Sequence, residues 1–209
     1  MNGDEVRASN SLDPSQLRGL DRYHLMTSLV VPRPIGWVST RGKDGVPNLA
    51  PFSYFGAISA APMLVGVSIG MPKGALKDTA ANIRARDAFC VNVVTADLLE
   101  AMNETSATVP AEVDEFQLAG LTLAESDRVD APFVAECPAV LECVVRSEPD
   151  LGDAANVFFI AEVVGIRLDP DLEREDGSQI ITPESLRPVG RLGGAAYAVA
   201  DVVRRVPRP

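Results

Sequence analysis

The chain has 209 residues, of which 46% are hydrophobic and 23% are charged, as is usual for a single globular domain. Its formal net charge of −10 argues against nucleic acid as the main partner, because phosphate backbones require clustered lysine and arginine. No apolar run approaches the length that spans a bilayer, and the polar, acidic N-terminus lacks the apolar core of a signal peptide. We therefore predict a cytoplasmic protein without a membrane partner.

The cysteines and the histidine argue against two common kinds of site. Cys90, Cys137 and Cys143 are odd in number and match no frequent zinc spacing, so we predict buried free thiols and no metal site. His24 is the only histidine and lies in a predicted N-terminal helical segment, and a serine or cysteine hydrolase of the usual type would depend on that one residue. We expect no protein nucleophile, and we interpret the acidic runs "EVDEF" and "DLEREDG" as solvated loops.

Turn and capping residues divide the first part of the chain. Residues 1–19 are predicted to form a loose tail and a short helix that Asp13 caps and Pro14 opens, with another helical turn from about Asp21. Strands are predicted over 35–40 and 46–55, joined by a hairpin turn at Asp44 and Gly45. A third strand is predicted over "MLVGVSIG", residues 63–70.

The second part of the chain mixes short helices with long strands. "KDTAANIRARDA" predicts a helix, followed by a strand over 89–95, a helix from residue 96 and a loop over 106–125. Strands over 139–148 and 156–168 form a predicted hairpin, and "QIITPESL" is a possible further strand. Six or seven strands joined mostly by short loops favour a mainly antiparallel barrel over a doubly wound parallel sheet.

One helix start carries the residue types of an anion site. In "KDTAANI", Lys77 supplies a positive charge and Thr79 a hydroxyl at a helix end that offers free N–H groups to a phosphate. Ser68, on the preceding strand, adds another possible donor. The alternative is an ordinary helix start that is capped by its own side chains.

A second segment, "PNLAPFSYF", combines polar and small residues on a predicted strand. Asn48 and Ser53 offer polar side chains, Ala50 leaves room, and Pro51 removes one N–H group. A flat ring would fit against such a segment and bond to its backbone. The alternative is an edge strand with a bulge at Pro51.

The order of three segments resembles the flavin reductase-like, FMN-binding split-barrel family, in its flavoredoxin-like subgroup. These segments are "VVPRPIGWVSTRGKDGVPNLAPFSYFGAISAAPMLVGVSIG", "LKDTAANIRARDAFCVNVV" and "RPVGRLGGAAYA". The resemblance covers about residues 20–200, which it implies form one flavin reductase-like domain before a tail over 201–209. It implies a mainly β fold with peripheral helices, a six-stranded antiparallel split barrel. It also implies a homodimer with FMN near the subunit interface.

The resemblance further implies which residues bind FMN. The "WVST" end would lie near the flavin, and "NLAPFS" would line the isoalloxazine ring. The "KDT" helix start and Ser68 would hold the phosphate, Arg33 would lie near the phosphate or the ring, and the C-terminal segment would close over the site. Carried onto this sequence, the implied cofactor-binding residues are Arg33, Ser39, Thr40, Asn48, Leu49, Ala50, Pro51, Phe52, Ser53, Ser68, Lys77, Asp78, Thr79, Arg191 and Tyr197.

The implied activity is that of an FMN-dependent oxidoreductase, a flavin reductase that uses NADH or NADPH, with a monooxygenase as a candidate partner. Hydride chemistry at flavin N5 needs no protein nucleophile. An alternative is an FMN-containing electron carrier that a redox protein reduces, and a third is a binding protein that has lost flavin. Other reductases of this superfamily use a downstream histidine to contact nicotinamide, whereas no histidine follows His24 here.

Overall fold

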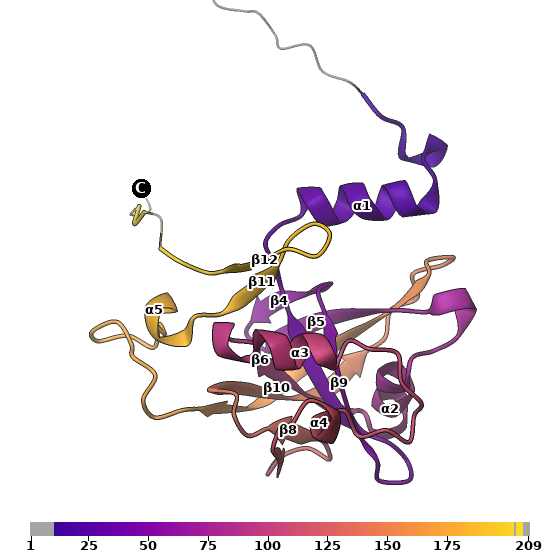
Figure 1. Cartoon of the computed structure of the whole chain (residues 1–209). Helices are drawn as coiled ribbons and strands as arrows, with labels where there is room; N and C mark the ends of the chain where they lie inside the picture. Colours follow the sequence, from indigo (N-terminus) through magenta and orange to yellow (C-terminus); the bar gives the residue numbers. More distant parts are fainter. Residues whose placement is uncertain (1–10, 203, 207–209) are drawn as a thin grey trace, which may run out of the picture.

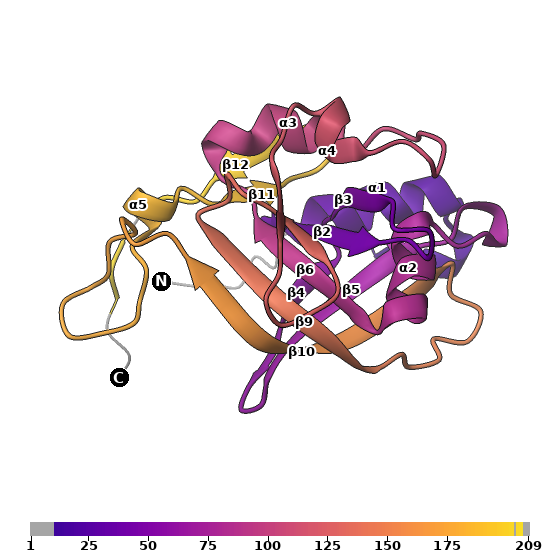
Figure 2. The same ribbon diagram turned by 90° about the horizontal axis from the view of Figure 1, so that it is seen from below.

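A computed structural model describes residues 11–202 and 204–206 and shows a strongly curled antiparallel sheet (Figures 1 and 2). Its strands follow the order β3-β2-β6-β9-β10-β5-β4, and every neighbouring pair is antiparallel. Their bounds are β2 Gly36–Arg41, β3 Pro47–Phe52, β4 Phe55–Ala60, β5 Met63–Gly70, β6 Ala88–Val93, β9 Ala139–Ser147 and β10 Asn156–Leu168. The predicted mainly β, antiparallel split barrel is confirmed, with seven strands in the main sheet instead of six.

Smaller elements surround this sheet. The strands β1 Arg33–Pro34, β11 Val189–Arg191 and β12 Tyr197–Val199 form one small sheet, and β7 Leu123–Glu125 pairs with β8 Pro132–Val134. The α-helices are α1 Gly19–Leu29, α2 Asp78–Arg86, α3 Leu99–Glu104, α4 Glu115–Leu118 and α5 Pro183–Leu186; Pro14–Gln16, Pro72–Gly74 and Ala96–Leu98 are 3₁₀ turns. In Figure 1, α1 stands outside the barrel beside the β11–β12 hairpin. No helix in the described part of the chain has the length and apolar character to cross a bilayer.

The predicted turn signals are present. Gly45 has a φ of 91°, and the Gly42 N–H donates to the Val46 carbonyl at 2.8 Å, which closes the β2–β3 hairpin. Asp13 caps the turn that Pro14 opens by accepting from the Ser15 N–H at 2.9 Å. Residues 1–10 of the predicted tail lie outside the described residues.

The predicted strand over 46–55 is wrong at its end. It divides into β3 and β4 at a bend over Ser53 and Tyr54, where the Tyr54 carbonyl accepts from the Ser68 N–H. β4 then pairs with β5 instead of continuing along β2. β3 is an edge strand, as one alternative predicted, but its register with β2 is unbroken through Pro51, so there is no bulge.

The C-terminal half follows the prediction in its long hairpin, since β9 and β10 pair with each other. "QIITPESL" forms no strand: Ile181 makes one isolated bridge to Arg174, and α5 begins at Pro183. The predicted loop over 106–125 contains α4 and β7. The second helical segment, expected to be short, is the eleven-residue helix α1.

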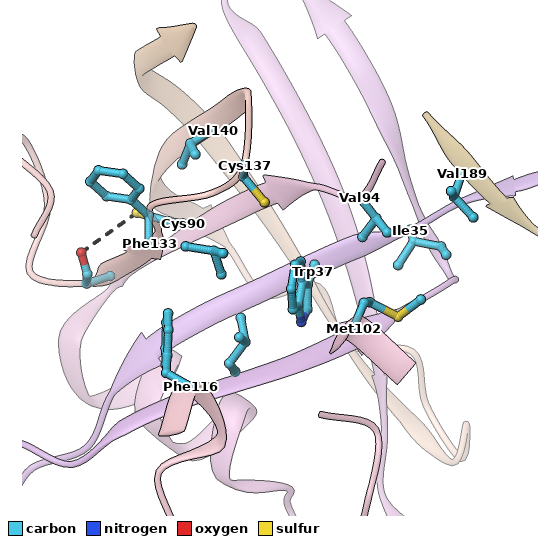
Figure 3. Close-up of a cluster of buried hydrophobic side chains, with 13 residues drawn as sticks. Ile35, Trp37, Cys90, Val94, Met102, Phe116, Phe133, Cys137, Val140 and Val189 are labelled. Carbon is cyan, nitrogen blue, oxygen red and sulfur yellow. Dashed lines mark hydrogen bonds between the residues drawn. The ribbon is translucent and has the colours of Figure 1, made fainter. Parts of the chain in front are cut away.

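Two apolar clusters fill the sheet and its helical cover. Figure 3 shows the first, in which Trp37 of β2 lies centrally among side chains from β6, β8, α3 and α4, and its indole N–H donates to Thr105 Oγ1 at 2.9 Å. The second lies in the curl of the sheet and includes Val67, Phe89 and Phe159. All three cysteines are buried and free, and burial raises the pKa of the Cys90 thiol to about 12.

The first cluster gives a stability test. Trp37→Ala removes a fully buried indole and leaves a cavity, so we expect the free energy of unfolding to fall by about 3–5 kcal/mol. Trp37→Phe keeps most of the apolar volume and should cost clearly less. Urea unfolding followed by circular dichroism measures both, because Trp37 is the only tryptophan and its loss removes the fluorescence signal. A loss below about 1 kcal/mol for the alanine variant would contradict this packing.

Candidate functional site

The structure brings the "NLAPFS" strand and the "KDT" helix start together. The Thr79 hydroxyl, in the first turn of α2, donates to Asn48 Oδ1 of β3 at 2.7 Å. Lys77 is exposed, and its Nζ lies 5.6 Å from the centre of the Phe52 ring. The two segments singled out in the sequence, about 30 residues apart, therefore form one continuous surface.

The start of α2 is not capped by a side chain. Lys77 is its N-cap residue and has no acceptor, Thr79 is turned to Asn48, and within the described residues no side chain bonds to the first-turn N–H groups. A helix end with free N–H groups and an adjacent cation attracts an anion. The alternative of an ordinary self-capped helix start is thus not what the structure shows.

Three of the implied site residues have no exposed surface at all. Ser39 is fully buried, donates to the Pro132 carbonyl at 2.6 Å and accepts from Asn92. Thr40 is also fully buried, and the Leu49 side chain belongs to the Trp37 cluster. These side chains pack in the interior and support strand β3 without reaching the surface.

Asn48 and Thr79 are only 8% and 1% exposed, and their side chains form hydrogen bonds with other protein groups. Asn48 Nδ2 donates to the Glu115 carboxylate at 2.9 Å, and the same carboxylate accepts the Leu49 N–H at 3.1 Å. Burial raises the pKa of Glu115, while these hydrogen bonds oppose the shift. The interpretation of "EVDEF" as a solvated loop is wrong at Glu115, which is 6% exposed.

Ser53 and Ser68 share a cleft of about 430 Å³ at the bend between β3 and β4. Tyr54, Phe55 and Phe158 add aromatic walls to it. Ser68 Oγ accepts from Asn156 Nδ2 at 2.9 Å, and no described residue accepts its own hydroxyl hydrogen. The cleft therefore combines flat apolar surface with hydroxyl groups that have hydrogen-bonding capacity left.

Arg33, Arg191 and Tyr197 lie on the other side of Ser53, around a smaller cavity of about 200 Å³. The buried Arg33 guanidinium donates to Ser53 Oγ and to the carbonyls of Thr27, Val30 and Leu192. Arg191 stacks on the Tyr197 ring at 4.3 Å and bonds to its hydroxyl, which donates to Asn103. The C-terminal hairpin thus adjoins the same end of β3.

The remaining implied residues follow the same strand. Ala50 and Pro51 are half-buried on β3, Phe52 is buried beneath Lys77, and Asp78 is exposed at the start of α2. His24 is exposed on α1, as expected for a surface residue without a catalytic role. The residue that sequence reasoning missed is Glu115; its only local signal was Asp114, whose carboxylate caps α4.

Comparison with known proteins identifies the class that this fold and site define. A family model for the flavin reductase like domain matches residues 26–183, and the chain belongs to that family. An uncharacterised protein of Halalkalibacterium halodurans is 38% identical over 95% of this chain and 96% of its own length.

Two solved structures are also similar. Nitrilotriacetate monooxygenase component B from Bacillus cereus is 34% identical, with a TM-score of 0.90 over 95% of this chain and 99% of that one. The 2-nitrobenzoate 2-nitroreductase of Pseudomonas fluorescens is 27% identical, with a TM-score of 0.85 over 96% of each chain.

The donors along β3 and α2 suit the cofactor that this family binds. FMN combines a phosphate, which needs cations and N–H groups, with a flat ring, which needs apolar surface and a few polar groups. The uncapped start of α2 and Lys77 supply the N–H groups and the cation for the phosphate. The cleft beside Ser53 supplies the apolar surface and polar groups for the ring, and Ser68, which the resemblance assigned to the phosphate, lines this cleft. The residues present therefore fit FMN.

Proposed function

We propose that the protein binds FMN and acts as an NADH- or NADPH-dependent flavin reductase. Bound FMN would supply hydride transfer through N5 of its ring, which is chemistry of the cofactor. The chain's own task is to hold the phosphate at Lys77 and the start of α2, and to hold the ring along β3 toward Ser53. Arg191 and Tyr197 would border the ring from the C-terminal hairpin.

The observation that carries the proposal is the uncapped, cationic start of α2 against Phe52 of β3. A net charge of −10 disfavours anion binding in general, so an anion needs local donors. The similarity to a monooxygenase component B suggests the use of the reduced flavin, namely its delivery to an oxygenase partner. A cytoplasmic location stays a prediction of the sequence.

A turnover assay tests this function. Purified protein mixed with FMN and either NADH or NADPH should oxidise the nicotinamide, followed as a loss of absorbance at about 340 nm, with flavin as the acceptor. We expect turnover with at least one of the two nicotinamides. A control without protein measures the background reaction, and the absence of turnover with both donors would remove the reductase proposal.

One observation favours the electron carrier as a second candidate. The only histidine lies on α1 and is exposed, so no histidine is available downstream to contact nicotinamide. The carrier would show FMN absorbance near 450 nm, no oxidation of nicotinamide, and reduction of its flavin by a ferredoxin-like protein. The same preparation thus separates the two candidates.

Lys77→Ala tests the phosphate end of the site. Removal of a charge-assisted contact should weaken FMN binding by about 1.5–3 kcal/mol, or roughly 10- to 150-fold in Kd. Binding of riboflavin, which lacks the phosphate, should weaken much less. Fluorescence titration gives both constants. Lys43→Ala, which removes the same charge from the exposed β2–β3 turn, is the matched control, and equal affinities in both variants would place the phosphate elsewhere.

We also propose that the protein is a homodimer in which α1 packs against a second copy. Leu20, Tyr23, Met26 and Leu29 recur every three residues along α1, and each is more than half exposed. Monomeric proteins rarely leave such an apolar surface in water.

Sedimentation equilibrium tests this assembly. The wild-type protein should sediment at twice the 22.2 kDa of the chain, and the double variant Met26→Glu, Leu29→Glu should shift toward the monomer. Leu151→Glu changes an exposed leucine of the β9–β10 loop in the same way and should leave the dimer intact. A wild-type monomer at micromolar concentration would contradict the proposal.

A further inference from the structure

Glu115 is the end point of a chain of buried hydrogen bonds. Asn82 Nδ2 donates to Thr40 Oγ1 at 3.1 Å, and the Thr40 hydroxyl donates to Asn48 Oδ1 at 3.3 Å. Thr79 donates to the same Asn48 oxygen. Asn48 Nδ2 then donates to Glu115, which also accepts the Leu49 N–H. Every donor in this chain points toward the carboxylate.

These bonds join four elements that are separate in the sequence. Thr40 lies on β2, Asn48 on β3, Thr79 in the first turn of α2, and Glu115 at the start of α4. α2 and β3 are the two elements that carry the proposed phosphate and ring ends of the flavin site. Asn48 and Thr79 connect them directly, and Glu115 fixes the side of the Asn48 amide that faces Thr79, because a carboxylate accepts hydrogen bonds and cannot donate one.

Burial of the Glu115 carboxylate costs free energy, so its position calls for a role in the fold or in the site. A buried carboxylate loses its hydration, and burial accordingly raises the pKa of Glu115. Asp78, at the exposed start of α2, adds repulsion, and no described cation forms an ion pair with Glu115. Hydrogen bonds compensate for this burial, and they come from the Leu49 N–H and the Asn48 amide of β3 and from the backbone of Glu115 itself.

We propose that Glu115 is a positioning residue of the flavin site, which sets the distance between the ring-binding strand β3 and the phosphate-binding start of α2. This inference rests on the proposed function, since it assigns Glu115 a role in FMN binding. Glu115 touches no cofactor in this role. It acts through Asn48 and Thr79, whose side chains face the interior.

The test compares FMN with riboflavin in folded variants. Glu115→Met keeps the side-chain length but leaves the Asn48 amide and the Leu49 N–H without an acceptor. We expect its Kd for FMN to rise about tenfold or more, and the ratio of the riboflavin and FMN constants to fall about fivefold. Glu115→Gln, which keeps one oxygen for the Leu49 N–H, should lie between Glu115→Met and the wild type.

Two further variants make the result specific. Glu142→Met removes another buried carboxylate, on β9, whose hydrogen-bond partner is Ser126, and should leave both flavin constants within about twofold. Thr79→Val cuts only the link to α2 and should weaken FMN while sparing riboflavin. If Glu115→Met does not fold, as judged by near-ultraviolet circular dichroism, Glu115→Gln decides the question, because it alters the same carboxylate, and an FMN affinity equal to that of the wild type then overturns the positioning role.

The outcomes separate the inference from the proposed function. A wild-type protein that binds neither flavin overturns the proposed function before any variant is compared. If the wild type binds FMN, then a folded Glu115→Met variant with unchanged affinity overturns the positioning role. Equal losses for FMN and riboflavin also overturn it, because they indicate a general loss of structure and no effect on the spacing of the two ends.

Discussion

The buried amide of Asn48 is the constraint around which this part of the molecule is built. It lies on an edge strand, and an edge strand has only one neighbour to satisfy its polar groups. A buried amide without hydrogen-bond partners would destabilise the fold, because it loses its hydration and gains nothing in exchange. Groups from other elements must therefore bond to it. Thr79 from α2 and Glu115 from α4 do so, and Thr40 adds a further hydrogen bond to the same amide. The edge of the sheet is thereby covered.

Arg33 plays the corresponding part at the other end of β3. Its guanidinium accepts no hydrogen bond and donates to carbonyls at the end of α1 and in the turn of the C-terminal hairpin. Helix C-termini leave carbonyls unpaired, and a buried arginine is well suited to satisfy several of them at once. The end of α1 and the C-terminal hairpin are thus held together beside Ser53. For this reason residues as distant in the sequence as Arg33 and Arg191 border one cavity.

Much of the fold was predictable because its signals are local. Asp13 with Pro14, Gly45 in the hairpin turn, and the apolar runs of β5 and β10 act on their own neighbours in the sequence. The division between β3 and β4 was not predictable, because the apolar run continues across Ser53 while the pairing partner changes from β2 to β5. "QIITPESL" has strand-forming residues but finds only one bridging partner.

The candidate site was also predictable only in part. The resemblance located the two segments that meet, but the direction of each side chain depends on partners far away in the chain. Glu115 resembles any acidic loop residue in the sequence, and its burial follows from Asn48 and Leu49, which are 67 and 66 residues away. Ser39 and Thr40 occupy consecutive positions of β2, yet both are buried, because helices and loops cover one face and the curled sheet encloses the other.

The distribution of charge explains how an acidic protein can favour one point for an anion. Each ion pair in the described part of the chain uses an arginine, such as Arg84 with Glu148 and Arg86 with Asp130, so those cations are already neutralised. The chain has only three lysines, and two of them, Lys73 and Lys77, lie in the segment that leads into α2. Because the acidic surface repels anions elsewhere, an unpaired lysine at an uncapped helix start gains selectivity from its surroundings. Under the proposed function, a phosphate bound at this position would place its attached ring along β3.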